Sequence, residues 1–452
     1  MSRFQWVIVA TCVWLNMLDG FDVMAMAFTA KRVTAYFSIT ATELGLLISA
    51  GLVGMALGSM FLAPLADRLG RRPMLIAGVA TTAVGMVLAS FASTALLLGA
   101  FRILTGLGIG IILACVNVLL SEYSSHKHRG LAIGLYTAGY GIGAGLGGFA
   151  AVALMGDDPA GWRVVFLVGG IVTLLSTAVV FFVLPESVDF LVQNRPRNVL
   201  AKLNRIADKI KQPRLESEKE IPDPVPVTSS RIGELFKPRF RRSTLLIWAV
   251  FFLIMLGFYF VNSWTPALLT QAGMTENQGI IAGLLMSLGG ATGAVFYGLI
   301  VSRFSSRKVL IGFAILTAGA MVVFILSSSL IFLAMVLAGG VGFLVNGCMA
   351  GAYTTAPPRF PALARSTGMG WTIGIGRVGA ILAPTMAGAL LDAGATPVLL
   401  YVGAAGVMLL AALAVILLRD VDKGVDPADT EPAAPEMPNY LDQRQMHGES
   451  AS

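Results

Sequence analysis

The sequence predicts an all-α integral membrane protein, with twelve transmembrane helices in two six-helix bundles related by a pseudo-two-fold axis along the membrane normal. Of its 452 residues, 56% are hydrophobic and only 13% are charged, and the mean hydropathy is +0.79. A soluble domain has charged residues at about a quarter of its positions, so this composition excludes the soluble globular class. A helix needs about 20 apolar residues to cross a bilayer, and a chain of this length accommodates twelve crossings with loops and tails.

Twelve apolar windows follow one another along the chain, and each has the length of a membrane-spanning helix. The first window contains two aspartates and has no small-residue cleavage site near its end, so we expect a retained helix and not a signal peptide. The windows lie at roughly residues 5–29, 44–65, 73–92, 96–120, 130–154, 162–183, 243–265, 278–300, 308–327, 330–353, 366–390 and 397–418.

Two polar segments rich in proline interrupt or follow these windows, and neither can bury an apolar face in lipid. The first separates the sixth window from the seventh, and the second follows the twelfth. We therefore expect an N-terminal six-helix bundle, a cytoplasmic connector, a C-terminal six-helix bundle and a disordered cytoplasmic tail, at residues 1–184, 185–242, 243–418 and 419–452.

The basic residues predict the orientation of the chain. With both termini and the connector on one side, about 27 of the 32 Lys and Arg residues lie on that side. By the positive-inside rule that side is the cytoplasm, which predicts a multi-pass protein of a bacterial-type inner membrane with both termini cytoplasmic. The net charge of +7 is explained by this asymmetry, and we expect no nucleic-acid partner. Three cysteines within apolar runs show no disulfide or metal-ligand spacing.

An internal repeat relates the two halves. Shifting the sequence by 235 positions brings Arg72 onto Arg307 and Asp157 onto Asp392, and it also superimposes several glycines of the fifth and eleventh windows. Six crossings return the chain to its starting side, so the two copies have the same orientation in the membrane. Such a parallel repeat is typical of carriers that rock about a central site.

A charged turn lies between the second and third windows, in the sequence Asp67-Arg68-Leu69-Gly70-Arg71-Arg72. This segment resembles the loop signature of the major facilitator superfamily, and a weaker copy follows the eighth window. The resemblance covers essentially all twelve windows and implies the fold of that superfamily. A carboxylate beside clustered guanidiniums can latch helix ends together and release them. We expect Asp67, Arg68, Arg71 and Arg72 to contribute to gating, although each arginine could serve only as a topogenic charge.

A finer resemblance rests on the first window. Asp19-Gly20-Phe21-Asp22 resembles the acidic signature of the aromatic acid:proton symporter family, with Phe21 where tyrosine is usual. Further matches lie around Arg102 and Glu122 in the fourth window, around Arg377 in the eleventh, and at 185–187. The resemblance implies uptake of an aromatic carboxylate together with protons.

The residues of the first window support this interpretation physically. An aspartate near the bilayer centre costs about 2.5–3.5 kcal/mol on insertion scales, so two of them require an aqueous cavity or a partner. Asp19 and Asp22 are three residues apart and share a helix face with Asn16. We expect this face to line the cavity and one of the two aspartates to carry the proton, unless both are structural.

Two arginines within the windows are the expected ligands of the substrate carboxylate. Arg102 and Arg377 keep their charge at any working pH, and a guanidinium matches a carboxylate with two parallel hydrogen bonds. The rise of 1.5 Å per residue places Arg102 and Asp22 at similar depths in the outer half. The alternative for Arg102 is a structural ion pair with Asp19 or Asp22, and for Arg377 a buried gate contact.

Other polar and aromatic positions complete the expected sites. Asn117, Asn346 and Tyr353 are candidates for binding the ring or its hydroxyl groups, and interhelical hydrogen bonding is the alternative for the two asparagines. Trp264 is expected in the interfacial aromatic belt. By resemblance, Glu122 joins the gating cluster at the cytoplasmic end of the fourth window, together with Arg129.

The chain shows no phosphate-binding loop, nucleophile elbow or metal-ligand spacing. We therefore expect a transporter and not an enzyme, with neither cofactor nor metal, working as a monomer. The predicted substrate is a benzoate-, hydroxybenzoate- or protocatechuate-like acid. One alternative is a carrier of another organic acid or metabolite, or a drug exporter. The other is a transporter-like sensor, which the short connector disfavours because it shows little apolar periodicity.

Overall fold

The structure is a computed structural model that describes residues 1–217, 221, 232–360 and 365–418. The expected tail at 419–452 lies outside these residues. The first half of the chain contains α1 (Arg3–Phe37), α2 (Ala41–Leu57), α3 (Ala66–Leu69), α4 (Arg71–Ser90), α5 (Ala95–Tyr123), α6 (His126–Leu154) and α7 (Trp162–Val183). The connector contains α8 (Val188–Asn194), α9 (Val199–Ile210) and α10 (Ile232–Leu235). The second half contains α11 (Pro238–Gln271), α12 (Glu276–Val301), α13 (Ser306–Leu326), α14 (Ile331–Thr355), α15 (Arg365–Asp392) and α16 (Pro397–Ile416).

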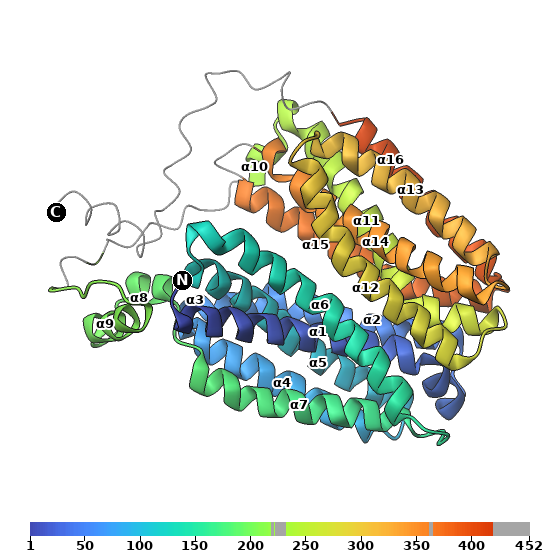
Figure 1. Cartoon of the computed structure of the whole chain (residues 1–452), viewed down its shortest axis with the longest axis horizontal. Coiled ribbons are helices and arrows are strands. Elements are labelled where there is room, and N and C mark those ends of the chain that lie inside the picture. The colour runs from blue at the N-terminus through green and yellow to red at the C-terminus, as the bar shows by residue number, and fades with distance from the viewer. Residues whose placement is uncertain (218–220, 222–231, 361–364, 419–452) are drawn as a thin grey trace.

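Twelve helical segments among the described residues are long and apolar enough to cross a membrane, which confirms the predicted all-α fold with twelve spans. The second span is composite, because a π-helix (Gly58–Leu62) and a 3₁₀ turn (Ala63–Leu65) join α2 to α3. Pro64 lies in this irregular stretch, and a proline has no N–H to continue the α-helical hydrogen bonds. In Figure 1 the blue to green helices of the first half and the yellow to red helices of the second lie as two adjacent groups.

Helix packing follows the same pattern in both halves. In the first half α1 packs on α6, α2 on α5 and α4 on α7, and in the second half α12 packs on α14, α11 on α15 and α13 on α16. The two halves meet where α2 packs on α15 and α6 on α12. We call the end of the bundle where α1 begins and α8 lies the connector end, and the opposite end, where α1 ends and α2 begins, the loop end.

Glycine allows the close approach of α2 and α15. A Cβ atom added at Gly45 would clash with the carbonyl oxygen of Pro384, and one added at Gly388 would clash with that of Ala41. Small residues at helix interfaces in lipid permit such backbone contacts. The contact therefore fixes the two halves against each other at the loop end.

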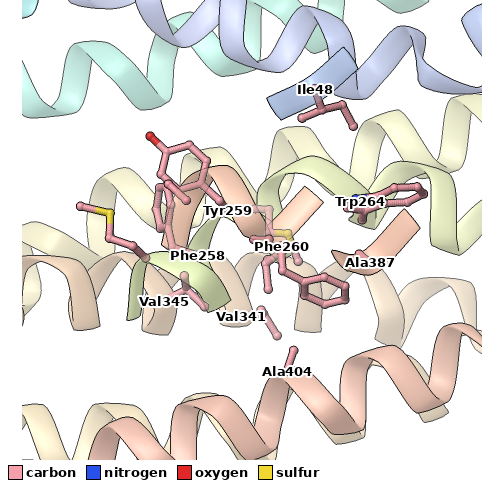
Figure 2. Close-up of a cluster of buried hydrophobic side chains, with 14 of the residues drawn as sticks. Ile48, Phe258, Tyr259, Phe260, Trp264, Val341, Val345, Ala387 and Ala404 are labelled. Carbon is pink, nitrogen blue, oxygen red and sulfur yellow. The ribbon is translucent and has the colours of Figure 1, made fainter. Parts of the chain in front are cut away.

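Aromatic and aliphatic side chains fill the second half. Figure 2 shows a cluster that includes Phe258, Phe260, Val341 and Val345, and in the same view the hydroxyl of Tyr259 points away from the cluster toward helices of the first half. Trp264 is only 1% exposed, and its Nε1 donates to the carbonyl oxygen of Pro384 at 3.1 Å. The expected place of Trp264 in an interfacial belt is therefore wrong: its indole ties α11 to α15.

One hydrogen bond recurs in both halves at the predicted repeat spacing. Nη2 of Arg72 donates to the carbonyl oxygen of Phe181 at 2.5 Å, and Nη2 of Arg307 donates to that of Ile416 at 2.6 Å. Donors and acceptors are each 235 positions apart. The two arginines thus attach the starts of α4 and α13 to the ends of α7 and α16.

The turn before each of these arginines differs between the halves. Gly70 has a φ of +104°, a conformation that favours glycine. Its repeat counterpart Ser305 has a φ of −59°, which any residue adopts. The second turn therefore has a different backbone path, in agreement with its weaker resemblance to the loop signature.

The connector contains an amphipathic helix. The apolar side chains of α9, which include Val199, Leu203, Ile206 and Ile210, are buried, and α9 packs against α1 near the connector end. Its outward face bears charged residues such as Lys202 and Arg205. The expectation of little apolar periodicity in the connector is thus wrong for these residues.

Candidate functional site

An ion pair between α1 and α5 lies inside the first half. Nη1 of Arg102 donates to Oδ1 of Asp22 at 2.5 Å, and the two side chains are 3% and 2% exposed. Gly51 of α2 makes room for the guanidinium, because a Cβ there would lie 3.0 Å from Nη2 of Arg102. The guanidinium also lies over the ring of Phe166, with 5.7 Å between Cζ of Arg102 and the ring centroid. The sequence predicted that an acid and a base meet here, and the structure selects Asp22 as the acid.

Asp19 lies on the same face of α1 but is partnered differently. It is 6% exposed, and its Oδ1 accepts no hydrogen bond from any described residue. Arg377 of the second half and Asp22 are the charged residues that act on it electrostatically. Asn16, the third polar residue of this face, donates from Nδ2 to the carbonyl oxygen of Tyr136 at 2.6 Å. The polar face of α1 therefore points into the protein, as predicted.

Arg377 extends from α15 toward the first half. Its Nη1 lies 2.8 Å from Sδ of Met55 in α2 and 3.4 Å from the hydroxyl of Tyr259 in α11. A thioether sulfur is a weak acceptor, and the contact with Tyr259 is at the limit of a hydrogen bond. Tyr353 and Tyr140 are further electrostatic neighbours. The guanidinium thus lies among hydroxyl groups and holds no carboxylate in a direct ion pair among the described residues.

A pocket connects the surroundings of these two arginines. Tyr259 and Ser263 of the second half line it together with residues of the first half, which are Asp22, Val23, Ile48, Gly51, Leu52, Met55, Arg102 and Ile109. Met55 and Tyr259 are the two residues that Arg377 contacts. The pocket therefore lies between the two halves, next to both predicted carboxylate ligands.

Tyr353, Asn117 and Asn346 are the other residues that the sequence predicts to bind the substrate. Tyr353 is 38% exposed, stacks edge-on against Phe251 with 5.2 Å between ring centroids, and is an electrostatic neighbour of Arg377. The side-chain amide of Asn117 donates to the carbonyl oxygen of Leu113, and that of Asn346 donates to Gly342 in its own helix. Tyr353 thus lies in the same polar region as Arg377, whereas both asparagines bond to their own helices and Asn117 also interacts with the hydroxyl of Tyr136.

A second charged cluster lies at the connector end of the first half. Nη1 of Arg71 pairs with Oε1 of the buried Glu122 and donates to the hydroxyl of Ser187 at 2.7 Å. Glu122 also accepts from the Ser187 hydroxyl at 2.8 Å and from the backbone N–H of Val188 at 3.0 Å. Oδ1 of Asp67 lies 3.6 Å from Nη2 of Arg71, but the side chain of Asp67 is 74% exposed. The cluster therefore joins the start of α4, the end of α5 and the start of α8.

Glu186 is a member of this cluster that the list of expected gating residues lacks. Its Oε1 accepts from the backbone N–H groups of Arg71 and Arg72 at 2.8 and 3.0 Å, and so it satisfies the free donors at the start of α4. A Cβ at Gly70 would lie 2.6 Å from its Oε2. Its position after the sixth span was a sequence match, but its contact with the distant start of α4 follows only from the fold.

The remaining predicted gating residues are placed as follows. Arg68 is exposed, and Arg72 binds the carbonyl oxygen of Phe181 and covers the Phe181 ring at 5.3 Å. The side chain of Arg129 lies outside the described residues. Within the described ranges no group of three or more His, Cys, Asp or Glu residues is placed to hold a metal ion.

Two polar contacts between described residues join the loop ends of the two halves. The carboxylate of Asp392, at the end of α15, accepts from the backbone N–H groups of Ala41 and Thr42 at 3.0 and 2.8 Å. Arg32, near the end of α1, donates to Oε1 of Glu276 at the start of α12 at 3.0 Å, and to backbone carbonyls at the end of α6. Ala41 and Glu276 are 235 positions apart, so the two contacts occupy equivalent places in the repeat.

Comparison with known proteins gives a family. The sequence model of the Major Facilitator Superfamily matches residues 12–359 and, in a second overlapping match, residues 275–439. The gallate transporter of Pseudomonas putida is 31% identical over 440 residues, which cover 95% of each chain. The 4-hydroxybenzoate transporter PcaK of Pseudomonas aeruginosa is 32% identical, over 87% of this chain and 88% of its own. These relatives confirm the predicted resemblance to aromatic acid symporters.

Solved structures agree with the fold. The xylose transporter XylE from Escherichia coli, in a partially occluded inward-open conformation, superimposes with a TM-score of 0.72 over 94% of this chain and 100% of its own, at 17% identity. At this identity the likeness extends to the fold alone. This chain therefore shares its overall fold with a sugar carrier.

Proposed function

Because the chain belongs to the Major Facilitator Superfamily, we propose that it is a proton-coupled secondary transporter that imports a small aromatic carboxylate by alternating access. Benzoate, hydroxybenzoates and protocatechuate represent the substrate class. Relatives that cover most of the chain carry gallate and 4-hydroxybenzoate. Substrate and protons are then the partners of the site, and the activity is translocation without bond-making.

The environment of Arg377 is the observation that carries this proposal. Its guanidinium reaches the boundary between the halves, where its hydrogen-bond contacts among the described residues are with a thioether sulfur and a hydroxyl at 3.4 Å. A carboxylate would give it two charge-assisted hydrogen bonds in place of these weak contacts. Tyr259 and Tyr353 beside it supply ring faces and edges for an aromatic substrate. Arg102 is already paired with Asp22, so Arg377 is the arginine that we assign to the substrate carboxylate.

The same charges suggest how protons are coupled. Asp22 balances Arg102 directly, and removing its charge would leave a buried guanidinium unpaired, which is costly. Oδ1 of Asp19 has no hydrogen-bond partner within the described ranges, and the cation that acts on this aspartate is Arg377. A substrate carboxylate on Arg377 neutralises that cation and makes protonation of Asp19 more favourable. We therefore assign the coupling proton to Asp19.

Contacts between the halves suggest the steps of alternating access. The bonds of Asp392 and Arg32 close the loop end, so we assign this conformation to the inward-facing side of the cycle. The connector end would face the cytoplasm of a bacterial cell, with the protein in the inner membrane and both termini inside, because most basic residues lie at that end. Outward opening requires both contacts to break, while the charged cluster of Arg71 and Glu122 adjusts at the connector end.

Counterflow in proteoliposomes tests the proposal. Vesicles preloaded with benzoate, 4-hydroxybenzoate or protocatechuate should take up the labelled acid, whereas the corresponding amides should neither enter nor compete. Arg377→Lys should lose most of this exchange, because an ammonium cannot form the two-pronged contact. Arg303→Lys, on the exposed surface of the same half, is the matched control and should transport normally.

The alternatives give different results in the same assay. A carrier of other metabolites, or a drug exporter, would exchange its own compounds. Replacing an aromatic acid by its amide would then not change the exchange. A transporter-like sensor would bind an acid without counterflow. Either result would reject the proposed function.

A further inference from the structure

Besides Nε of Arg102, two buried polar atoms near the arginine site have no hydrogen-bond partner among the described residues. One is Oδ1 of Asp19 in α1, and the other is the hydroxyl of Tyr140 in α6. A buried polar group without a partner costs free energy, so such groups are rare and call for an explanation. The motif in the first span points to Asp19, whereas no sequence pattern points to Tyr140, which lies in a glycine-rich helix.

The two groups belong to one polar region. The backbone of Tyr140 lies against α1, because a Cβ at Gly20 would clash with its carbonyl oxygen, and Gly20 follows Asp19 directly. The groups that act electrostatically on the Tyr140 hydroxyl are Tyr259, Asp19, Arg377 and Asp22. Tyr140 thus brings a hydroxyl from the first half toward the residues that surround the proposed carboxylate ligand in the second.

We propose that Tyr140 determines specificity by hydrogen bonding to a ring hydroxyl of the substrate, with Asp19 as the second partner of that hydroxyl. The proposal rests on the proposed function and narrows the substrate class from aromatic acids to hydroxylated aromatic acids. Arg377 holds the carboxylate at one end of the ring, and the two unpaired groups bind the hydroxyl at another position.

The chemistry of the two groups fits a hydroxyl better than other substituents. A phenol is both donor and acceptor, so it can donate to a carboxylate oxygen and accept from the hydroxyl of Tyr140. When Asp19 carries the coupling proton, its carboxyl group still has an acceptor oxygen. A methyl or hydrogen at the same position leaves both protein groups unpaired. Sites that hydrogen-bond a substrate hydroxyl reject analogues that lack it more strongly than apolar pockets reject an added group.

The test compares acids by competition in the counterflow assay. For the wild-type protein, 4-hydroxybenzoate or 3-hydroxybenzoate should compete better than benzoate and better than the methylbenzoate of the same geometry. In Tyr140→Phe the preference should fall about five- to tenfold, as expected for one lost hydrogen bond, while competition by benzoate stays unchanged. The control is Tyr401→Phe, which removes a buried hydroxyl in the second half that bonds the hydroxyl of Thr265. Neither Asp19 nor Arg377 is among the groups that act on it, so this variant should not affect the preference.

The outcomes separate this inference from the proposed function. If benzoate and the hydroxybenzoates weaken equally in Tyr140→Phe, or if wild-type protein prefers methylbenzoates, the specificity role is wrong while aromatic acid transport stands. If no aromatic acid competes in the wild type, the proposed function fails and this inference fails with it. If Tyr140→Phe does not fold, the wild-type comparison with methylbenzoates still tests whether the site prefers a ring hydroxyl to a methyl group.

Discussion

The carboxylate of Asp392 caps α2 through Thr42, accepting from its backbone N–H at 2.8 Å and from its hydroxyl at 2.5 Å. Asp392 ends α15 in the second half, and Thr42 lies in the first turn of α2 in the first half. Such a cap satisfies donors that a helix start leaves free. Here the cap comes from the other half of the protein, so it holds the loop end closed only while the halves are together.

Removing this cap should favour the conformation that is open at the loop end. In Asp392→Ala the three hydrogen bonds to Ala41 and Thr42 are lost, so the closed state is weakened. A cysteine placed at Ser263, in the lining of the central pocket, should react about threefold faster with a membrane-impermeant thiol reagent added from outside.

The repeat provides the matched control for this experiment. Asp157 is the counterpart of Asp392 at the spacing of 235 residues, and in its place Arg32 makes the contact with the second half. Asp157→Ala should leave the labelling rate unchanged. Equal labelling in Asp392→Ala and wild type would show that the cap does not control opening.

Two residues of the charged cluster at the connector end, Glu122 and Asp67, should differ in their contribution to stability. Glu122 is buried and accepts hydrogen bonds from Arg71, Ser187 and Val188. Glu122→Ala removes these three bonds and leaves Arg71 with its longer contacts to Asp67 and Asp189, so it should lower the free energy of unfolding by about 2–3 kcal/mol. Asp67 is mostly exposed, and Asp67→Asn should change the melting temperature little. Thermal melting in detergent measures both effects.

Transport assays complete this comparison. Asp67→Asn should bind substrate normally but exchange it more slowly, because its carboxylate lies at the turn between α3 and α4 and far from the central pocket. Loss of substrate binding in a folded Asp67→Asn protein would contradict a gating role.

The sequence predicted the spans because a lipid environment imposes length and apolarity on each helix. It also predicted that Asp22 and Arg102 face inward, since charges in lipid need a partner. It did not select between Asp19 and Asp22 as the partner of Arg102, because the two share a helix face and the choice depends on how α1 is rotated against α5. Hydropathy and spacing say nothing about this rotation.

The missed residues share a cause. Glu186 and Asp392 cap helices that are far away in the sequence, and Tyr140 has neither charge nor motif to draw attention to it. Their roles depend on contacts between segments separated by about a hundred residues or more. Such contacts follow from tertiary packing, which the periodicity of single helices does not determine.

The pair of Asp22 and Arg102 should behave as a unit in folding. Asp22→Asn alone leaves the Arg102 guanidinium buried without a counter-charge, and breaking such a pair costs about 3–5 kcal/mol. The double variant Asp22→Asn, Arg102→Gln removes both charges and should recover much of the lost stability. Arg102→Lys keeps the charge but loses the geometry of the contact, and it should lose most uptake. Strictly additive melting temperatures in the cycle would contradict the coupling.

Proton coupling through Asp19 should make substrate binding depend on pH. If a substrate carboxylate on Arg377 favours protonation of Asp19, the linkage is reciprocal, and protonation tightens substrate binding by the same factor. Lowering the external pH should therefore strengthen binding in the wild type. In Asp19→Asn the side chain is neutral at every pH, so this dependence should flatten, while the intact ion pair of Asp22 and Arg102 keeps the helices in place. The variant should reach the membrane, exchange substrate in counterflow at equal concentrations, and fail to accumulate it against a gradient.

Asp22→Asn is the matched comparison, because it removes the same charge from the same helix face. It should lower stability, and the pH dependence should remain in whatever protein still transports. Binding assays across a pH series, together with uptake driven by an imposed proton gradient, measure both parts. Gradient-driven accumulation by Asp19→Asn would show that another group carries the proton.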